Sequence, residues 1–271
     1  MAEYLDQSQL FFDRKAHKGH TKMAHAHYHN QHELYFLVQG KTKYFVGNEI
    51  FLLEPGDLLF VPKHIFHKTD NLDSTNVQRL LISFDEEDIG PQGESFLQGL
   101  KKDKLVRIPE EFQYRLQEVL HHLEEEQLQQ QPHYRQMQRL YLQQLLILIS
   151  RLQSRHINTH KNPRILLIQS VAKYISESPD RDLSLSALAK QFAISEGNLS
   201  RQFKSVTGVS LSEYVNICRI TAAEKLLLQG EKSITAVALR CGFNDSNYFA
   251  AVFKKLKGIT PKKYALQNRK H

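Results

Sequence analysis

Two segments near the C-terminus of this 271-residue chain repeat one another almost position for position. The first is LSLSALAKQFAISEGNLSRQFKSVTGVSLSEYV, residues 183–215, and the second is KSITAVALRCGFNDSNYFAAVFKKLKGITPKKYA, residues 232–265. Ser184 matches Ser233 at an offset of 49, and after one inserted residue Phe203 matches Phe253 at an offset of 50. Two copies are too few for a solenoid, which needs about three. The repeat therefore predicts a pair of similar units.

Each copy has the pattern of a helix-turn-helix motif. A serine suited to capping precedes a short helix, because its hydroxyl can accept a bond from a free backbone N–H of the first turn. Small alanines, Ala189 and Ala238, end the apolar face of that helix and let a second helix cross closely. The predicted turns are residues 193–195 and 242–244, and the second helices bury the following residues: Leu199, Phe203, Phe249 and Phe253. A plain helical bundle with basic faces is the alternative interpretation.

The charge is unevenly distributed along the chain. Residues 162–271 hold 17 Lys and Arg against 8 Asp and Glu, a net charge of +9, whereas residues 1–161 hold 19 against 21. A basic segment joined to a slightly acidic one favours a polyanionic partner for the basic segment alone. Charge by itself also fits a solvated surface, so the motifs must decide between the two.

The residues between the two copies read as one helix over 211–229, with Tyr214, Ile217 and Ile220 among its inward side chains. At 1.5 Å per residue it spans roughly 28 Å, close to the ~34 Å of one DNA turn. The exposed sides of the two second helices remain polar. Such helices can enter the major groove, with Arg or Asn on base edges and Lys on phosphate.

Residues 233–264 resemble the signature of the AraC/XylS family of transcription regulators, through I-x-x-VA, GF, YF, FKK and G-I-T-P-x-x-Y. The resemblance covers about 100 residues and implies a helical unit with two helix-turn-helix motifs that read successive major grooves. By position it implies these DNA-binding residues: Gly197, Asn198, Ser200, Arg201, Lys204, Asp245, Ser246, Asn247, Tyr248, Ala250, Ala251 and Lys254. The chain departs from the family where Ala251 replaces a common Arg and where Ala265 follows Tyr264.

The N-terminal half reads as short strands followed by two helices. Runs at 33–40, 41–53, 57–62 and 77–84 are rich in Val, Phe, Tyr and Leu and are separated by turn residues such as Gly47-Asn48, which favours a β-sandwich or barrel. Amphipathic patterns at 111–130 and 133–154 predict helices. The second pattern is apolar on more than one face, which fits either packing on the chain's own sheet or an additional contact with a second subunit.

The two cysteines of the chain lie in its C-terminal segment. Cys218 and Cys241 form no disulfide framework and are expected to be small core residues.

Histidines are concentrated in this half, with eight of the 14 between His17 and His67. The segment around them resembles the two cupin motifs, with His27-x-His29-x3-Glu33-x6-Gly40 and then Gly56-x5-Pro62 before His67. His64 and Thr21 replace glycines of the motifs. The resemblance implies a small-molecule effector site with these residues: His27, His29, Glu33, Tyr35 and His67. His27, His29, Glu33 and His67 would also suit Fe, Mn, Zn or Ni, so a divalent metal stays open and no cofactor is certain.

These observations predict an α+β chain of three parts. Residues 1–107 form a cupin-like effector-binding β-barrel, residues 108–155 a helical dimerisation and linker region, and residues 163–271 an all-α DNA-binding domain with two helix-turn-helix motifs. The expected protein is not an enzyme. It is a dimeric, effector-responsive transcription regulator whose effector is a sugar or another small molecule, and its partners are double-stranded DNA and, if it activates, RNA polymerase. The alternative is a metal-dependent cupin enzyme, an isomerase or a dioxygenase.

The same sequence predicts where the protein works. No apolar run approaches the ~20 residues of a membrane span, and the N-terminus has no signal-peptide pattern. We therefore expect a bacterial cytoplasmic protein that is bound to DNA and has no membrane partner.

Overall fold

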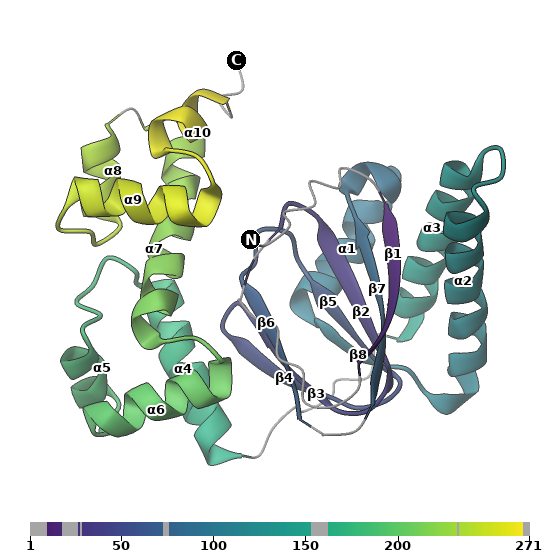
Figure 1. The fold of residues 1–271 in the computed structure, drawn as a ribbon, viewed down its shortest axis with the longest axis horizontal. Helices are drawn as coiled ribbons and strands as arrows, with labels where there is room; N and C mark the ends of the chain where they lie inside the picture. The colour runs from purple at the N-terminus through teal and green to yellow at the C-terminus, as the bar shows by residue number, and fades with distance from the viewer. Residues whose placement is uncertain are drawn as a thin grey trace. The chain divides into compact units, whose positions relative to one another are not determined.

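The structure, a computed structural model, describes residues 10–17, 27, 29–72, 76–152, 162–231 and 233–267. The chain divides into two compact units, Met1–Thr159 and His160–His271, and each is described by itself (Figure 1). Within the described ranges, we find no helix with both the length and the apolar character needed to cross a bilayer.

The first unit is built on two antiparallel sheets. One has the strand order β1-β7-β2-β5-β8 and the other the order β4-β3-β6. The strands are β1 (Phe11–His17), β2 (His32–Gln39), β3 (Thr42–Val46), β4 (Glu49–Leu53), β5 (Asp57–Val61), β6 (His67–Asn71), β7 (Val77–Phe84) and β8 (Leu105–Arg107). The predicted Gly-Asn turn joins β3 to β4, with Gly47 in a left-handed conformation at φ 62°.

The alternation of side chains along β2 separates two cores. Tyr35 and Leu37 point between the sheets, where they pack with side chains of β3, β4, β5 and β7. Leu34 and Phe36 point to the opposite face, against the helices. Successive residues of a strand point to opposite faces of the sheet. Both sets are buried because one face lies against the other sheet and the opposite face lies against the helices. Glu33 has the same parity as Tyr35 and therefore belongs to the interior of the barrel.

Helices cover the outer face of the larger sheet. They are α1 (Gly93–Lys102), α2 (Glu110–Gln129) and α3 (Tyr134–Leu152), with a short 3-10 turn, η1, at Glu86–Asp88. Figure 1 shows α2 and α3 side by side against this sheet. Leu142, Leu145 and Ile149 of α3 are buried there. The bounds of α2 and α3 lie within two residues of the prediction, whereas β1, β6, α1 and β8 were not predicted.

The second unit contains only helices among its described residues. They are α4 (Pro163–Glu177), α5 (Leu185–Gln191), α6 (Glu196–Thr207), α7 (Leu211–Leu228), α8 (Ile234–Arg240), α9 (Ser246–Lys257) and α10 (Pro261–Gln267). The central helix α7 buries Tyr214, Ile217 and Ile220, as its periodicity predicted. Cys241 is buried and Cys218 is half-buried. Burial raises the pKa of the Cys218 thiol to about 12 and that of Cys241 to about 11, so both are packing residues rather than reactive thiols.

Candidate nucleic-acid interface and sensor cluster

The first helix-turn-helix motif consists of α5 and α6. The Ser184 hydroxyl accepts a bond from the backbone N–H of Ala187 at 3.3 Å, which is the predicted cap. Leu199 and Phe203 of α6 are completely buried. In the turn, Ala193 adopts φ 51° and the N–H of Ile194 donates to the carbonyl of Ala189 at 3.0 Å.

The second motif, α8 and α9, repeats the serine cap and the turn of the first. The Ser233 hydroxyl accepts from the N–H of Ala236 at 3.2 Å. In the turn Gly242 adopts φ 83°, and the N–H of Phe243 donates to the carbonyl of Ala238 at 3.0 Å. Each of these atoms lies 49 residues after its counterpart in the first motif. The sequence repeat is therefore a repeat of hydrogen bonds as well.

The outward face of α6 exposes four of the five DNA-binding residues that were predicted on this helix. Gly197, Ser200, Arg201 and Lys204 are exposed. Nε of Arg201 donates to the carbonyl of Gly197 at 3.1 Å, and the other guanidinium N–H groups remain available. Asn198 is half-buried, and its side-chain oxygen accepts from Gln202 at 2.9 Å. The face therefore combines an anchored cation with hydroxyl and ammonium donors.

The outward face of α9 is less polar. Asn247, Tyr248, Ala251 and Lys254 are exposed, whereas Ser246 and Ala250 are half-buried. The Asp245 carboxylate caps the helix by accepting from the backbone N–H groups of Asn247 and Tyr248 at 2.6 and 2.8 Å. Two methyl groups, those of Ala250 and Ala251, lie at positions where the family resemblance implied DNA-binding residues, and neither can form a side-chain hydrogen bond.

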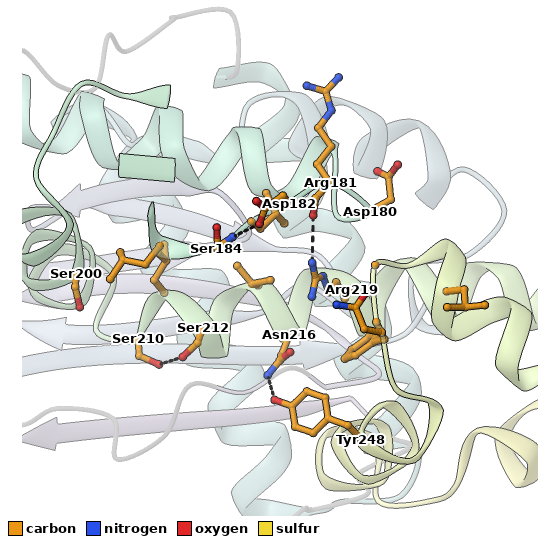
Figure 2. Close-up of a pocket in the computed structure, with 18 residues that line it drawn as sticks. Asp180, Arg181, Asp182, Ser184, Ser200, Ser210, Ser212, Asn216, Arg219 and Tyr248 are labelled. Carbon is orange, nitrogen blue, oxygen red and sulfur yellow. Dashed lines mark hydrogen bonds between the residues drawn. The ribbon is translucent and has the colours of Figure 1, made fainter. Parts of the chain in front are cut away.

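A groove of about 720 Å³ lies between the two motifs, along α7. Figure 2 shows Ser212, Asn216 and Arg219 of α7 together with Ser200 of α6 and Tyr248 of α9 around it. The groove was not predicted from the sequence, because its lining comes from five separate segments of the second unit.

In the first unit, the structure brings together four of the five predicted sensor residues. The ring centroids of His27 and His67 are 4.6 Å apart and those of His29 and His67 are 4.8 Å apart. One ring nitrogen from each of the three histidines lies within 4.8 Å of the others. The Glu33 carboxylate joins them, with Oε2 at 3.1 Å from Nε2 of His29.

Backbone carbonyls orient two of the histidine rings. Nδ1 of His29 lies 2.7 Å from the carbonyl oxygen of Gln31, and Nδ1 of His67 lies 2.9 Å from that of Ile65. We assign the proton to Nδ1 in both, since a carbonyl can only accept. In His67 the lone pair of Nε2 then points into the cluster, whereas Nε2 of His29 donates to the Glu33 carboxylate. Nε2 of His67 is buried and has no hydrogen-bond partner among the residues that the structure describes, an arrangement typical of metal-binding histidines.

Electrostatics within the cluster favour an ionised carboxylate. Burial alone would raise the pKa of Glu33, but hydrogen bonds from His29 and Tyr44 and nearby histidine charge lower it to about 2. Burial lowers the pKa of His67 to about 3, so this ring is neutral at physiological pH. Burial also opposes the charged form of His29, and the hydrogen bond and charge of Glu33 outweigh it and raise that pKa.

Two tyrosines lie beside the cluster: Tyr35, which was predicted to contact the effector, and Tyr44, which was not predicted. Tyr35 packs edge-on against Tyr44 with ring centroids 5.1 Å apart, and it is buried in the interior core. Tyr44 was missed, although its hydroxyl donates to Oε1 of Glu33 at 2.8 Å and its ring lies 6.0 Å from that of His67. The period-two alternation of β3 was the available signal, because it places Tyr44 on the interior face with Val46.

One departure from the cupin pattern has a structural explanation. His64, which stands where the motif has a glycine, adopts φ 61°. Glycine takes this left-handed conformation at little cost, whereas other residues take it under strain. The N–H of His64 donates to the carbonyl of His29 at 2.9 Å, so the turn is retained with a histidine in it. The other departure, Thr21, lies outside the described residues.

Comparison with known proteins identifies two domain families and several relatives. Residues 188–267 match the helix-turn-helix domain family and residues 17–83 match the cupin domain family. The chain is 25% identical over 238 residues to the transcriptional activator RhaR of Mannheimia succiniciproducens, covering 88% of this chain and 86% of that protein. It is 29% identical over 255 residues to the transcriptional activator RhaS of Escherichia coli, covering 87% and 85%. Among solved structures, ToxT from Vibrio cholerae O395 aligns with a TM-score of 0.40 at 15% identity, covering 95% of this chain and 97% of that one.

The fold and the two sites define a class, a DNA-binding regulator with a cupin-type effector domain, rather than a cupin enzyme. Within that class, residues 188–267 carry a helix-turn-helix domain of the AraC type, and the expected α+β architecture is confirmed.

Proposed function

We propose that this protein is a transcriptional activator that inserts α6 and α9 into successive major grooves of one operator. The observation that carries the proposal is the duplicated serine-capped motif, since both copies present the exposed face of a second helix. The names of the relatives RhaR and RhaS support activation. RNA polymerase is then a further partner, and the bacterial cytoplasm is the expected location.

The two reading helices have different tasks in this proposal. On α6, Arg201 reads a base edge, because an anchored guanidinium suits a bidentate contact with guanine. Ser200 and Lys204 contact phosphates or neighbouring bases. On α9, Asn247 supplies a polar contact, and the methyl groups of Ala250 and Ala251 touch thymine methyls. The proposed interface also includes the other residues that the family resemblance implied: Gly197, Asn198, Asp245, Ser246, Tyr248 and Lys254.

The cluster of His27, His29, Glu33 and His67 is the proposed effector site, with Tyr35 behind it. An ionised carboxylate, imidazole rings and a tyrosine hydroxyl suit a small molecule rich in hydroxyl groups, such as a sugar. An effector shifts DNA binding only if it binds two arrangements of the chain with different affinities. The response of the protein to its effector is therefore measured as a change in its affinity for DNA.

A divalent metal ion is the second candidate occupant of the same cluster. The buried Nε2 of His67, which has no partner within the described ranges, and the Nδ1 bonds to carbonyls favour it. His27, His29, His67 and Glu33 would hold the ion, which would supply open coordination positions for an effector oxygen. Metal analysis of the purified chain, with His67→Ala as the comparison, tests this occupant.

Dimerisation is proposed through the outer surface of α2 and α3. Tyr114 and Leu128 of α2 are 75% and 78% exposed, and Leu140 of α3 is 58% exposed. Large apolar side chains on an exposed helix pair suit burial against a second copy. Two copies would then place two DNA-binding units, residues 163–271 of each chain, on repeated half-sites. Sedimentation of the full chain, with Leu128→Glu as the comparison, tests the dimer.

The proposal is tested with a duplex that the full-length wild-type chain selects from a random-sequence DNA pool. We expect affinity to fall steeply with salt, as phosphate contacts require, and to exceed that for a scrambled duplex by at least ~10³-fold. The variant Arg201→Ala should reduce this preference by roughly 5- to 150-fold, the equivalent of about 1–3 kcal/mol, while it remains folded. Equal affinity of the wild type for selected and scrambled duplexes would contradict the proposal.

A further inference from the structure

The side chain of Arg219 is the point at which the two helix-turn-helix motifs are joined. It lies near the middle of α7. Its Nε donates to the carbonyl of Pro179 at 3.0 Å, and its Nη2 donates to the carbonyl of Arg181 at 3.2 Å. Both carbonyls belong to the loop that leads into the first motif. The planar guanidinium therefore fixes this loop to α7 through two directed bonds, which a lysine could not reproduce.

The same guanidinium contacts the turn of the second motif. Its Cζ lies 5.7 Å from the ring centroid of Phe243, a cation–π arrangement. The neighbouring Gly242 has φ 83°, and a Cβ added there would lie 2.7 Å from the carbonyl oxygen of Pro179 and 3.0 Å from two guanidinium nitrogens. The turn of one motif therefore lies directly against the entry loop of the other, at a distance that only glycine permits.

A second tie lies nearly one helical turn earlier on α7. Nδ2 of Asn216 donates to the hydroxyl of Tyr248 at 2.9 Å, which holds the first turn of α9 against α7. Figure 2 shows Asn216 and Arg219 on the groove side of α7, with their bonds to Tyr248 and Arg181. Together the two residues hold parts of both motifs against one helix.

The charge around the groove disfavours a direct role for Arg219 in DNA binding. Its guanidinium is half-buried and is committed to two carbonyls. Asp180 and Asp182 also line the groove, and their carboxylates would repel a phosphate. The geometry fits a structural tie between the motifs better than it fits a phosphate contact.

We propose that Arg219 is a positioning residue that sets the separation and rotation of α6 and α9, and thereby the spacing between the two DNA subsites that one chain accepts. This inference rests on the proposed reading of DNA by both motifs. One added base pair moves a subsite by about 3.4 Å along the duplex and rotates it by about 35°. A rigidly held pair of helices fits only one spacing between the two DNA subsites, whereas a loosely held pair fits several spacings.

The test compares three duplexes with the full-length chain. One is the duplex selected from random DNA by the wild type, and the others have one base pair added or removed between its two subsites. We expect the wild type to bind the altered duplexes at least ~10-fold more weakly, because one motif loses its base contacts. In Arg219→Gln and Arg219→Lys this ratio should shrink toward one. Lys225→Gln, which removes a charge from an exposed position of the same helix, should keep the wild-type ratio.

The salt dependence separates positioning from contact. A lost phosphate contact lowers the slope of log affinity against log salt by about one, whereas a lost positioning residue leaves the slope unchanged. The half-buried Asn216 provides a second variant, Asn216→Ala, in case Arg219→Gln does not fold as judged by circular dichroism. It should shrink the ratio in the same direction.

Two results would overturn the inference: folded variants that keep the wild-type spacing ratio, or a salt slope reduced by about one at an unchanged ratio. A wild type that shows no sequence preference at all would instead remove the proposed function on which the inference rests.

Discussion

The turns of the two motifs have equivalent residues in a left-handed conformation, a glycine in one motif and an alanine in the other. Exchanging glycine and alanine at these two positions should therefore change stability in opposite directions. Gly242 and Ala193 occupy equivalent positions, 49 residues apart, and adopt φ 83° and 51°. A residue with a Cβ pays roughly 1–2 kcal/mol in this left-handed region. The variants Gly242→Ala and Ala193→Gly therefore test the same geometry from both directions.

The magnitudes follow from the local structure. In Gly242→Ala the new Cβ also meets the carbonyl of Pro179 at 2.7 Å, so the backbone must shift. Alanine also lowers the conformational entropy of the unfolded chain, which stabilises the folded state by about 0.4–1 kcal/mol and offsets part of this loss. We therefore expect a net destabilisation of about 1–3 kcal/mol. Ala193→Gly removes the left-handed strain but loses the same entropy, so we expect stabilisation by about 0.5–1 kcal/mol.

Amide hydrogen exchange of the full chain measures both effects locally. Peptides covering residues 234–257 should exchange roughly 5- to 150-fold faster in Gly242→Ala, since 1.4 kcal/mol corresponds to a factor of ten. Peptides covering residues 185–207 should exchange about 2- to 5-fold more slowly in Ala193→Gly. Unchanged exchange in Gly242→Ala, or faster exchange in Ala193→Gly, would refute the assigned turn geometry.

Three further changes test the two sites and the core. Arg201→Ala should weaken binding to the selected duplex by about 1–3 kcal/mol in fluorescence anisotropy without changing the circular dichroism spectrum; unchanged affinity would remove Arg201 from the readers. Glu33→Ala should abolish the effector response in a reporter assay and leave basal DNA binding intact, whereas an unaltered response would place the effector elsewhere. Lys257→Met leaves the buried Glu224 carboxylate without its ammonium partner at 2.5 Å, although the Tyr264 hydroxyl still donates to Oε1, and should cost about 3–5 kcal/mol in thermal unfolding; a loss under 1 kcal/mol would show that the pair is solvated.

The strongest predictions from the sequence concerned local patterns. Serine caps, apolar periodicity and turn residues predicted α5 to α9 and the hairpin of β3 and β4, because each depends on neighbours in the chain. Local chemistry decides such features, and one sequence is enough to read them. The grouping of His27, His29, Glu33 and His67 was instead implied by the resemblance to the cupin motifs, since His67 lies about 40 residues after His27 in the chain.

Features that depend on distant partners were not predicted. Tyr44 reaches Glu33 only because β3 pairs with β6 and the two sheets face one another. The strand β8 is three residues long and exists through its pairing with β5, and β1 depends in the same way on β7. The role of Arg219 required knowledge of which carbonyls and which ring surround it, and these come from loops about 40 residues before it and 24 residues after it.

Footprinting of the full-length chain on its selected duplex tests most directly whether one chain lays two reading helices along DNA. The account predicts two protected major-groove segments for each bound chain, on one face of the duplex and about one helical turn apart, and loss of one segment in Arg201→Ala. A single protected segment for each chain, unaffected by changes on α9, would contradict it.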